Sequence, residues 1–191
     1  MKNKFSAIKI VMGLGNPESG YKNTYHNAGK LMVDHLRGKY LLNGGVKIDD
    51  YRKKISGNFE SCAVDKLTLV KTTNYMNENG KAAKAALKSF GAKAASLLVA
   101  HDDNDIEIGK YKISFGSGSA GHNGVQSIIE NTGTKDFWRL RIGIGKPGEI
   151  NKVKAGDFVL KKITLKDKEL MNSAFNGAIE EIFGGSGRNA I

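Results

Sequence analysis

Segments typical of β-strands and segments typical of α-helices alternate along this chain, and no other feature limits its possible folds as much. Apolar runs or alternating patterns predict strands at residues 7–14, 58–64, 67–71, 95–100, 110–115, 137–144 and 158–160. Apolar residues at helical spacing predict helices at residues 26–40, 76–90 and 165–183, and another that includes residues 125–129. Elements in this order bury their apolar faces as helices on both sides of one sheet. We therefore expect an α/β fold, a single-domain three-layer sandwich with a mixed, largely parallel central sheet.

The length and composition fit one domain that covers residues 1–191, with a frayed tail at 184–191. The chain has 191 residues, 40% of them apolar, which is enough for one core. Cys62 is the single cysteine, so no disulfide can form within the chain, and this fits a cytoplasmic protein. No apolar run reaches the ~18 residues of a membrane span. Lys9 interrupts the apolar start of the chain, which we interpret as a strand rather than a signal peptide.

A basic excess suggests a polyanionic partner. The chain has 30 Lys and Arg against 19 Asp and Glu, a net charge of +11. Nine basic but only three acidic residues fall within 135–166. A charge of this sign attracts nucleic acid, although a lysine-coated surface without such a partner would have the same composition.

Four polar segments each follow a predicted strand. They are residues 13–29, 72–82, 101–105 and 116–124, and each carries Asn, His or Asp. In α/β folds, ligands bind where the carboxyl ends of the strands meet the loops. We therefore expect the functional site to combine side chains from these segments.

His26 is the strongest candidate for a catalytic base. Near its ordinary pKa of about 6.5, a neutral imidazole can take a proton from water. The reaction is helped when a carboxylate holds the other ring nitrogen, and Asp102, just after the predicted strand at 95–100, could do this. The alternative is that His26 is a capping or hydrogen-bonded structural histidine.

Three asparagines could supply neutral hydrogen bonds to a substrate. Asn16, Asn77 and Asn123 lie in predicted turns or at helix starts. A carboxamide offers two N–H donors and an acceptor, which suits a peptide backbone or a developing oxyanion. Asparagine is also favoured at turns and helix N-caps, so each of the three could instead be structural.

Other kinds of site fit the sequence less well. The Gly-Leu-Gly at 13–15 does not complete a dinucleotide-binding motif, and 116–124 could bind phosphate but lacks the Lys-Ser/Thr of a P-loop. The histidines and Cys62 do not have the spacing of a zinc site. A cysteine nucleophile does not fit, because Cys62 has no histidine nearby in the sequence. A serine nucleophile does not fit either, because no Gly-x-Ser-x-Gly is present. Residues 101–105 could hold a hard cation, but such clusters more often form hydrogen-bonded loops.

Taken together, the polar segments resemble the bacterial-type peptidyl-tRNA hydrolase family. The resemblance runs from about residue 8 to residue 160 and rests on ordered motifs. These are GLGNP with YHNAG, TTNYMNENGKA, HDDND, GHNG and RLRIGIGKP, followed by FVL. The resemblance implies a single α/β domain, an enzyme that hydrolyses the ester between peptide and tRNA, and no metal or organic cofactor.

The resemblance also implies functional residues, one position at a time. His26 matches the catalytic histidine and Asp102 the carboxylate that orients it. Positions in the peptide cleft or near the tRNA end are Asn16, Tyr21, Tyr75, Met76, Asn77 and Asn123. Plausible contacts to tRNA phosphates, each alternatively a solvated charge, are Lys110, Lys112, Arg139, Arg141 and Lys146. The implied partner is peptidyl-tRNA, and the family is usually monomeric, with no membrane association.

The chain departs from the family pattern at several positions while the His, Asp and Asn set stays intact. Tyr25 stands where Arg is common, and the other departures are Glu18, Thr72, Tyr75, Ser119 and Ala120. Two further functions remain open. One is a non-catalytic RNA-binding relative on the same fold, against which the intact set argues. The other is a hydrolase of small acyl esters, against which the net charge argues mildly.

Overall fold

One mixed sheet forms the centre of the molecule. The computed structural model describes residues 4–43, 47–54, 57–148 and 155–184. Across these residues seven strands pair in the order β2-β3-β4-β1-β5-β7-β6. They are β1 (Ile10–Gly13), β2 (Arg52–Lys54), β3 (Phe59–Val64), β4 (Leu67–Thr72), β5 (Leu97–Glu107), β6 (Tyr111–Phe115) and β7 (Trp138–Gly145). The central strands β4, β1, β5 and β7 are parallel neighbours, whereas the β2–β3, β3–β4 and β6–β7 pairs are antiparallel.

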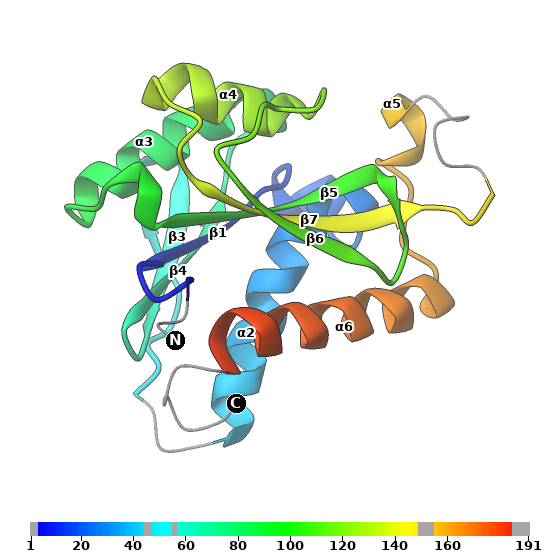
Figure 1. Ribbon diagram of the computed structural model, residues 1–191, viewed down its shortest axis with the longest axis horizontal. Coiled ribbons are helices and arrows are strands. Elements are labelled where there is room, and N and C mark those ends of the chain that lie inside the picture. The colour runs from blue at the N-terminus through cyan, green and yellow to red at the C-terminus, as the bar shows by residue number, and fades with distance from the viewer. Residues whose placement is uncertain (1–3, 44–46, 55–56, 149–154, 185–191) are drawn as a thin grey trace.

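Helices cover both faces of this sheet (Figure 1). α2 (Ala28–Asn43) and α6 (Leu165–Ile179) lie on one face, and α3 (Asn79–Ser89) and α4 (Asn123–Thr132) lie on the other. Successive side chains of a strand point to opposite faces. Val11 and Met12 of β1 accordingly belong to different apolar clusters, one packed beneath α2 and α6 and the other beneath α3 and α4. The predicted three-layer α/β architecture is confirmed.

Short elements connect these layers. They are α1 (Glu18–Tyr21), α5 (Ala155–Phe158), the 3-10 turns η1 (Tyr25–Asn27), η3 (Met76–Glu78) and η4 (Ala94–Ser96), and the π-helical end η5 (Glu180–Gly184). Within the described ranges, no helix is both long enough and apolar enough to cross a membrane. Of the predicted frayed tail, only Gly184 is described, and it ends η5.

Two predicted strands differ from the structure. β5 continues to residue 107 instead of ending at 100, because its polar residues find partners on β7: Asp103 forms an ion pair with Arg141. The strand predicted at 158–160 is wrong. Phe158 ends α5, and the Val159 carbonyl accepts a hydrogen bond from the His26 N–H at 2.8 Å. A three-residue apolar run is too short for periodicity to separate a strand from a turn.

Candidate active site

A cavity opens at the edge where the parallel central strands end. Its volume is about 650 Å³, comparable to small-molecule sites in other proteins. Its lining comes from the segment after β1, from β5, from the start of α4 and the loop before it, and from α5 and the residues after it. The lining residues are Asn16, His26, Asp102, Asp103, Asn104, Asp105, Ala120, Gly121, His122, Asn123, Gly156, Val159 and Leu160. The cavity therefore lies where the carboxyl ends of the strands meet the loops, which is the position expected from the sequence.

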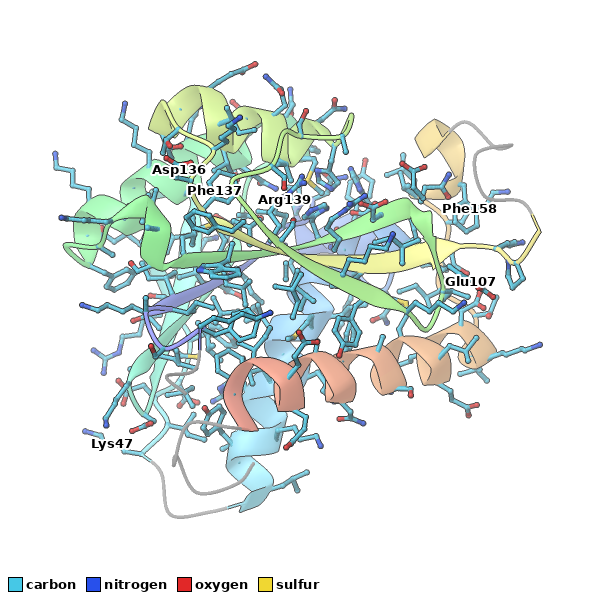
Figure 2. All side chains as sticks on the ribbon, viewed as in Figure 1. Lys47, Glu107, Asp136, Phe137, Arg139 and Phe158 are labelled. Carbon is cyan, nitrogen blue, oxygen red and sulfur yellow. The ribbon has the colours of Figure 1, made fainter. Side chains whose placement is uncertain are left out.

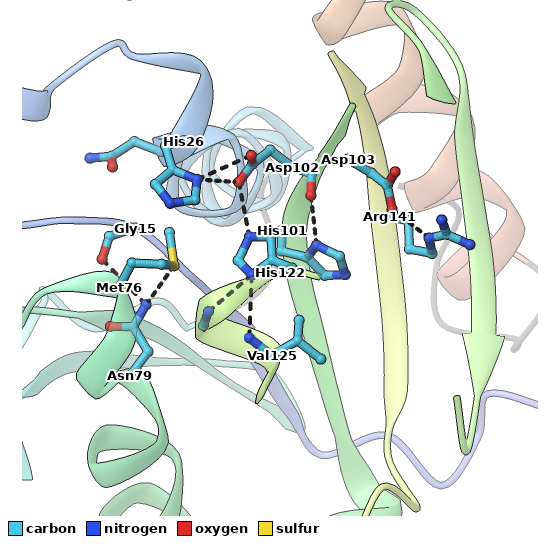
Figure 3. Close-up of polar contacts among 12 residues, drawn as sticks. Gly15, His26, Met76, Asn79, His101, Asp102, Asp103, His122, Val125 and Arg141 are labelled. Atoms are coloured by element: carbon cyan, nitrogen blue, oxygen red, sulfur yellow. Dashed lines mark hydrogen bonds and ion pairs between the residues drawn. The ribbon is translucent and has the colours of Figure 1, made fainter. Parts of the chain in front are cut away.

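His26 and Asp102 form a hydrogen-bonded pair in this cavity (Figure 3). His26 Nδ1 lies 2.9 Å from Asp102 Oδ1 and 3.1 Å from Oδ2, and the Asp102 side chain is only 4% exposed. Burial alone would lower the pKa of His26, but the Asp102 charge and hydrogen bond outweigh it and raise that pKa. Burial would likewise raise the pKa of Asp102, yet His26 and His122 hold it far below its usual range. The carboxylate is therefore ionised at neutral pH.

Close backbone packing brings the two residues together. His26 lies in η1, directly before α2. A Cβ added to Gly29 of α2 would lie 2.1 Å from the Ala100 carbonyl oxygen of β5. Glycine at this position therefore lets the start of α2 rest against β5 at Ala100, two residues before Asp102.

His122 is a third member of this group that the sequence analysis did not single out. Its Nδ1 accepts hydrogen bonds from the backbone N–H groups of Gly124 and Val125, at 3.1 and 3.3 Å, and so caps the start of α4. Because Nδ1 is an acceptor, the ring proton is on Nε2. Nε2 lies 3.1 Å from Asp102 Oδ1, to which it donates (Figure 3). The available signal was the GHNG motif, in which only the asparagine was assigned a role.

These contacts define the proton positions on His26 and Asp102. Asp102 is an ionised acceptor that receives one N–H from His122 and one from His26. The His26 proton therefore lies on Nδ1, which leaves the lone pair of Nε2 available. A histidine in this state can accept a proton from a water molecule in the cavity.

His101 supports the group as a neutral ring. Its Nδ1 donates a hydrogen bond to the Asp102 carbonyl oxygen at 2.7 Å, and its ring packs against His122 with centroids 4.5 Å apart. Burial, and next the neighbouring His122 and Arg139, lower the pKa of His101 well below its usual value. His101 therefore adds bulk but no positive charge beside Asp102.

Side-chain atoms of His26, Asp102 and His122 lie close enough together to bind a metal ion, but their hydrogen bonds to one another explain the arrangement without one. Ligand atoms of His26, Asp102 and His122 all lie within 4.8 Å of one another. The weaker hard-cation interpretation of 101–105 does not match the geometry, because the carboxylates have separate surroundings. Asp102 faces two histidines, Asp103 pairs with Arg141 at 2.6 Å, and Asp105 is exposed.

The structure brings only part of the predicted peptide-binding set to the cavity. Asn16 and Asn123 line it. Tyr21 and Tyr75 pack edge to face with ring centroids 6.5 Å apart, and Tyr75 is 56% exposed. Neither these two tyrosines nor the remaining two predicted residues are in the lining. Asn77 is exposed in η3, and Met76 is 5% exposed within the apolar cluster beneath α3 and α4.

The predicted phosphate-binding residues also differ in their surroundings. Lys112 and Lys146 are exposed, and Lys110 is exposed but pairs with Glu107 at 2.6 Å. Arg141 is largely engaged by Asp103, as described above. Arg139 projects toward the α4 side of the sheet (Figure 2) and is only 2% exposed. The Arg139 side chain is almost fully buried, and its contact with phosphate stays a prediction.

Comparisons with known proteins identify the family of this chain. The model of the family described as Peptidyl-tRNA hydrolase matches residues 10–183. The peptidyl-tRNA hydrolase of Idiomarina loihiensis is 37% identical over 175 residues, which cover 92% of this chain and 86% of the relative. That of Pseudomonas fluorescens strain SBW25 is 36% identical over 190 residues, covering 97% and 95%. The crystal structure of the Acinetobacter baumannii peptidyl-tRNA hydrolase aligns with a TM-score of 0.79 at 31% identity, covering 93% of this chain and 87% of that one.

The family match covers most of the chain, and the relatives are similar over nearly their full length. Sequence and structure comparisons thus lead to the same family as the motifs around the cavity. This chain belongs to the peptidyl-tRNA hydrolase family of enzymes.

Proposed function

We propose that this enzyme hydrolyses the ester bond of peptidyl-tRNA with His26 as the general base and Asp102 as the residue that orients it. The observation that carries the proposal is the hydrogen-bonded set of His26, Asp102 and His122. In that set the hydrogen-bond partners of each histidine determine which ring nitrogen carries the proton, and Nε2 of His26 is left as a proton acceptor. Hydrolysis of peptidyl-tRNA would free tRNA stranded by aborted translation.

The reaction needs one proton to move twice. His26 Nε2 takes a proton from water while the water oxygen attacks the ester carbonyl carbon. When the tetrahedral intermediate collapses, the bond from that carbon to the ribose oxygen breaks, and His26 returns the proton to the ribose oxygen. The products are a peptide carboxylic acid, ionised at neutral pH, and tRNA with a free ribose hydroxyl. Asp102 stabilises the imidazolium that exists between the two transfers.

Asparagines would stabilise the charge that develops on the carbonyl oxygen. Asn16 Oδ1 accepts the Met76 N–H at 2.9 Å, so its Nδ2 is the end available to the cavity. Asn123 lines the same cavity at the start of α4. Neutral donors held in place before the reaction stabilise an oxyanion without reorganisation of solvent. Asn123 would also lie near the tRNA end.

We also propose that the chain acts as a monomeric single domain in the cytoplasm, where peptidyl-tRNA arises. Residues from β1 to β7 share one sheet, and helices from both halves of the chain cover it. Exposed lysines such as Lys112 and Lys146 would contact the phosphates of the tRNA, and this contact would make affinity fall as salt rises.

The test is release of peptide from an N-acetylaminoacyl-tRNA by purified protein. We compare the parent with His26→Ala and with a matched control, His35→Ala. His35 lies on α2, where it bonds to Asn176 on α6, away from the cavity. We expect the parent and the control to release peptide, and His26→Ala to lose nearly all turnover while tRNA binding persists.

Three other outcomes would change the assignment. Equal turnover by the parent and His26→Ala would remove the general-base role. Binding of tRNA with no cleavage by the parent would favour the non-catalytic RNA-binding relative. Cleavage of simple acyl esters that is as efficient as cleavage of peptidyl-tRNA would favour a general esterase.

A further inference from the structure

Lys30 is a buried lysine near the cavity that the proposed mechanism does not use. Its side chain belongs to the first turn of α2 and is 3% exposed. Lysine is seldom buried this fully without a specific partner, and a cation at the start of a helix opposes the helix dipole. Its Nζ donates a hydrogen bond to the backbone carbonyl oxygen of Asn16 at 2.8 Å. Lys30 thus ties α2 to the loop after β1.

The loop is shaped so that the lysine can reach this oxygen. A Cβ added to Gly15 would lie 2.5 Å from Cδ of Lys30 and 2.8 Å from Oδ1 of Asn27. Asn27 holds the same residue of the loop: its Oδ1 accepts the Asn16 N–H at 2.9 Å, and its Nδ2 donates to the Asn16 carbonyl at 3.3 Å. Both backbone polar groups of Asn16 are therefore held from the start of α2.

These anchors fix the direction of the Asn16 side chain. Its Oδ1 accepts a hydrogen bond from the Met76 N–H at 2.9 Å. With the backbone and Oδ1 both held, Nδ2 can face the cavity in only a narrow range of directions. A misplacement of about 1 Å in a catalytic contact can lower the rate by about a hundredfold.

We propose that Lys30 is a positioning residue, which holds Asn16 so that its Nδ2 meets the carbonyl oxygen of the substrate. Lys30 does not line the cavity, so it acts through Asn16 rather than on the substrate. The proposal rests on the function proposed above for Asn16.

The test measures kcat and KM for release of peptide from N-acetylaminoacyl-tRNA. We compare Lys30→Met, Asn16→Ala and the double variant with the parent, and Lys39→Met is the matched control because Lys39 lies on the same helix. We expect Lys30→Met to lower kcat about tenfold with KM changed less than about twofold. In the Asn16→Ala background, the same substitution should lower kcat by less than about twofold. Lys39→Met should behave as the parent.

The design separates a positioning role from a structural one. Methionine keeps the apolar stem, and the Asn16 carbonyl oxygen still accepts a hydrogen bond from Asn27 Nδ2 in this variant. If Lys30→Met nevertheless unfolds below the assay temperature, Lys30→Gln takes its place in the same cycle. A structural role would give an equal loss of kcat in both backgrounds, and that result would overturn the proposal.

Failure of this inference is distinguishable from failure of the proposed function. A slow Asn16→Ala variant beside a Lys30→Met variant with parental kcat would overturn the role of Lys30 alone. Parental kcat in Asn16→Ala would overturn the role proposed for Asn16, and the role of Lys30 would fall with it.

Discussion

Replacing Asp102 with Asn tests the hydrogen bonds on which the proposed base depends. Aspartate and asparagine side chains have the same shape, but asparagine carries an NH₂ group where aspartate carries its second oxygen. His122 is committed as a donor at Nε2, because its Nδ1 accepts two backbone N–H groups. The amide oxygen must therefore stay at the Oδ1 position, and the amide nitrogen takes the Oδ2 position, 3.1 Å from His26 Nδ1. To accept from this nitrogen, His26 must move its own proton to Nε2, which can then no longer accept one from water.

Two effects lower kcat in Asp102→Asn. His26 is held in the wrong tautomer, which in serine proteases with a His–carboxylate pair lowers kcat by about 10⁴-fold. His26 also loses the charge that raises its pKa, so it becomes a weaker base. Because the amide oxygen can still accept one N–H from His26, we expect a loss of about 10³-fold in kcat, or ~4 kcal/mol of barrier.

The assay is kcat/KM for peptidyl-tRNA as a function of pH. Protonated His26 cannot accept a proton, so activity of the parent falls as pH falls through the His26 pKa, which Asp102 holds above the ordinary value. In Asp102→Asn the remaining activity should fall at lower pH than in the parent. Asp136→Asn, which removes an exposed carboxylate, is the control for the change in net charge. A loss below tenfold, or an unmoved acid limb, would refute the reasoning.

Three further predictions concern packing, a specific hydrogen bond and charge. Gly29→Ala should destabilise the fold by about 3 kcal/mol in urea unfolding, because its Cβ would lie 2.1 Å from a carbonyl oxygen of β5. Gly38→Ala, with no atom within 4 Å of the new Cβ, should instead stabilise the same helix by up to ~1 kcal/mol, and equal effects of the two substitutions would contradict this reasoning. Tyr25→Phe removes the hydrogen bond to Asp167 and should cost about 1 kcal/mol in thermal unfolding; an unchanged melting temperature would show that this bond adds nothing. Lys112→Ala should leave kcat unchanged and reduce the slope of log KM against log salt by ~0.7–0.9, whereas an unchanged slope would remove Lys112 from the tRNA surface.

The parts of the fold that sequence predicted well depend on local patterns. Helical spacing located α2, α3 and α6, and the alternation of elements implied one sheet covered on both faces. The length of β5 could not be predicted in this way, because a polar segment continues as a strand only when another strand supplies partners. Asp103 is stabilised by Arg141, 38 positions later in the chain.

The candidate site shows the same division between local and distant information. His26, Asp102 and two of the asparagines were found because each lies in a polar motif after a predicted strand, and the cavity contains them. His122 was missed because no local pattern in the GHNG motif indicated a partner for its ring. Its contact with Asp102 on β5, 20 positions earlier in the chain, appears only in the folded structure.

The arrangement makes the protonation of the base depend on how two helices sit against the sheet. His26 precedes α2 and His122 precedes α4, and both donate to one carboxylate on β5. A shift of either helix start would lengthen one of these hydrogen bonds and loosen the control of the His26 tautomer. At Gly29 the backbone of α2 lies directly against β5, and a Cβ added there would be 2.1 Å from the Ala100 carbonyl oxygen. Gly29→Ala protein that remains folded at low temperature should therefore have a lower kcat than the parent, whereas Gly38→Ala, on the same helix, should not.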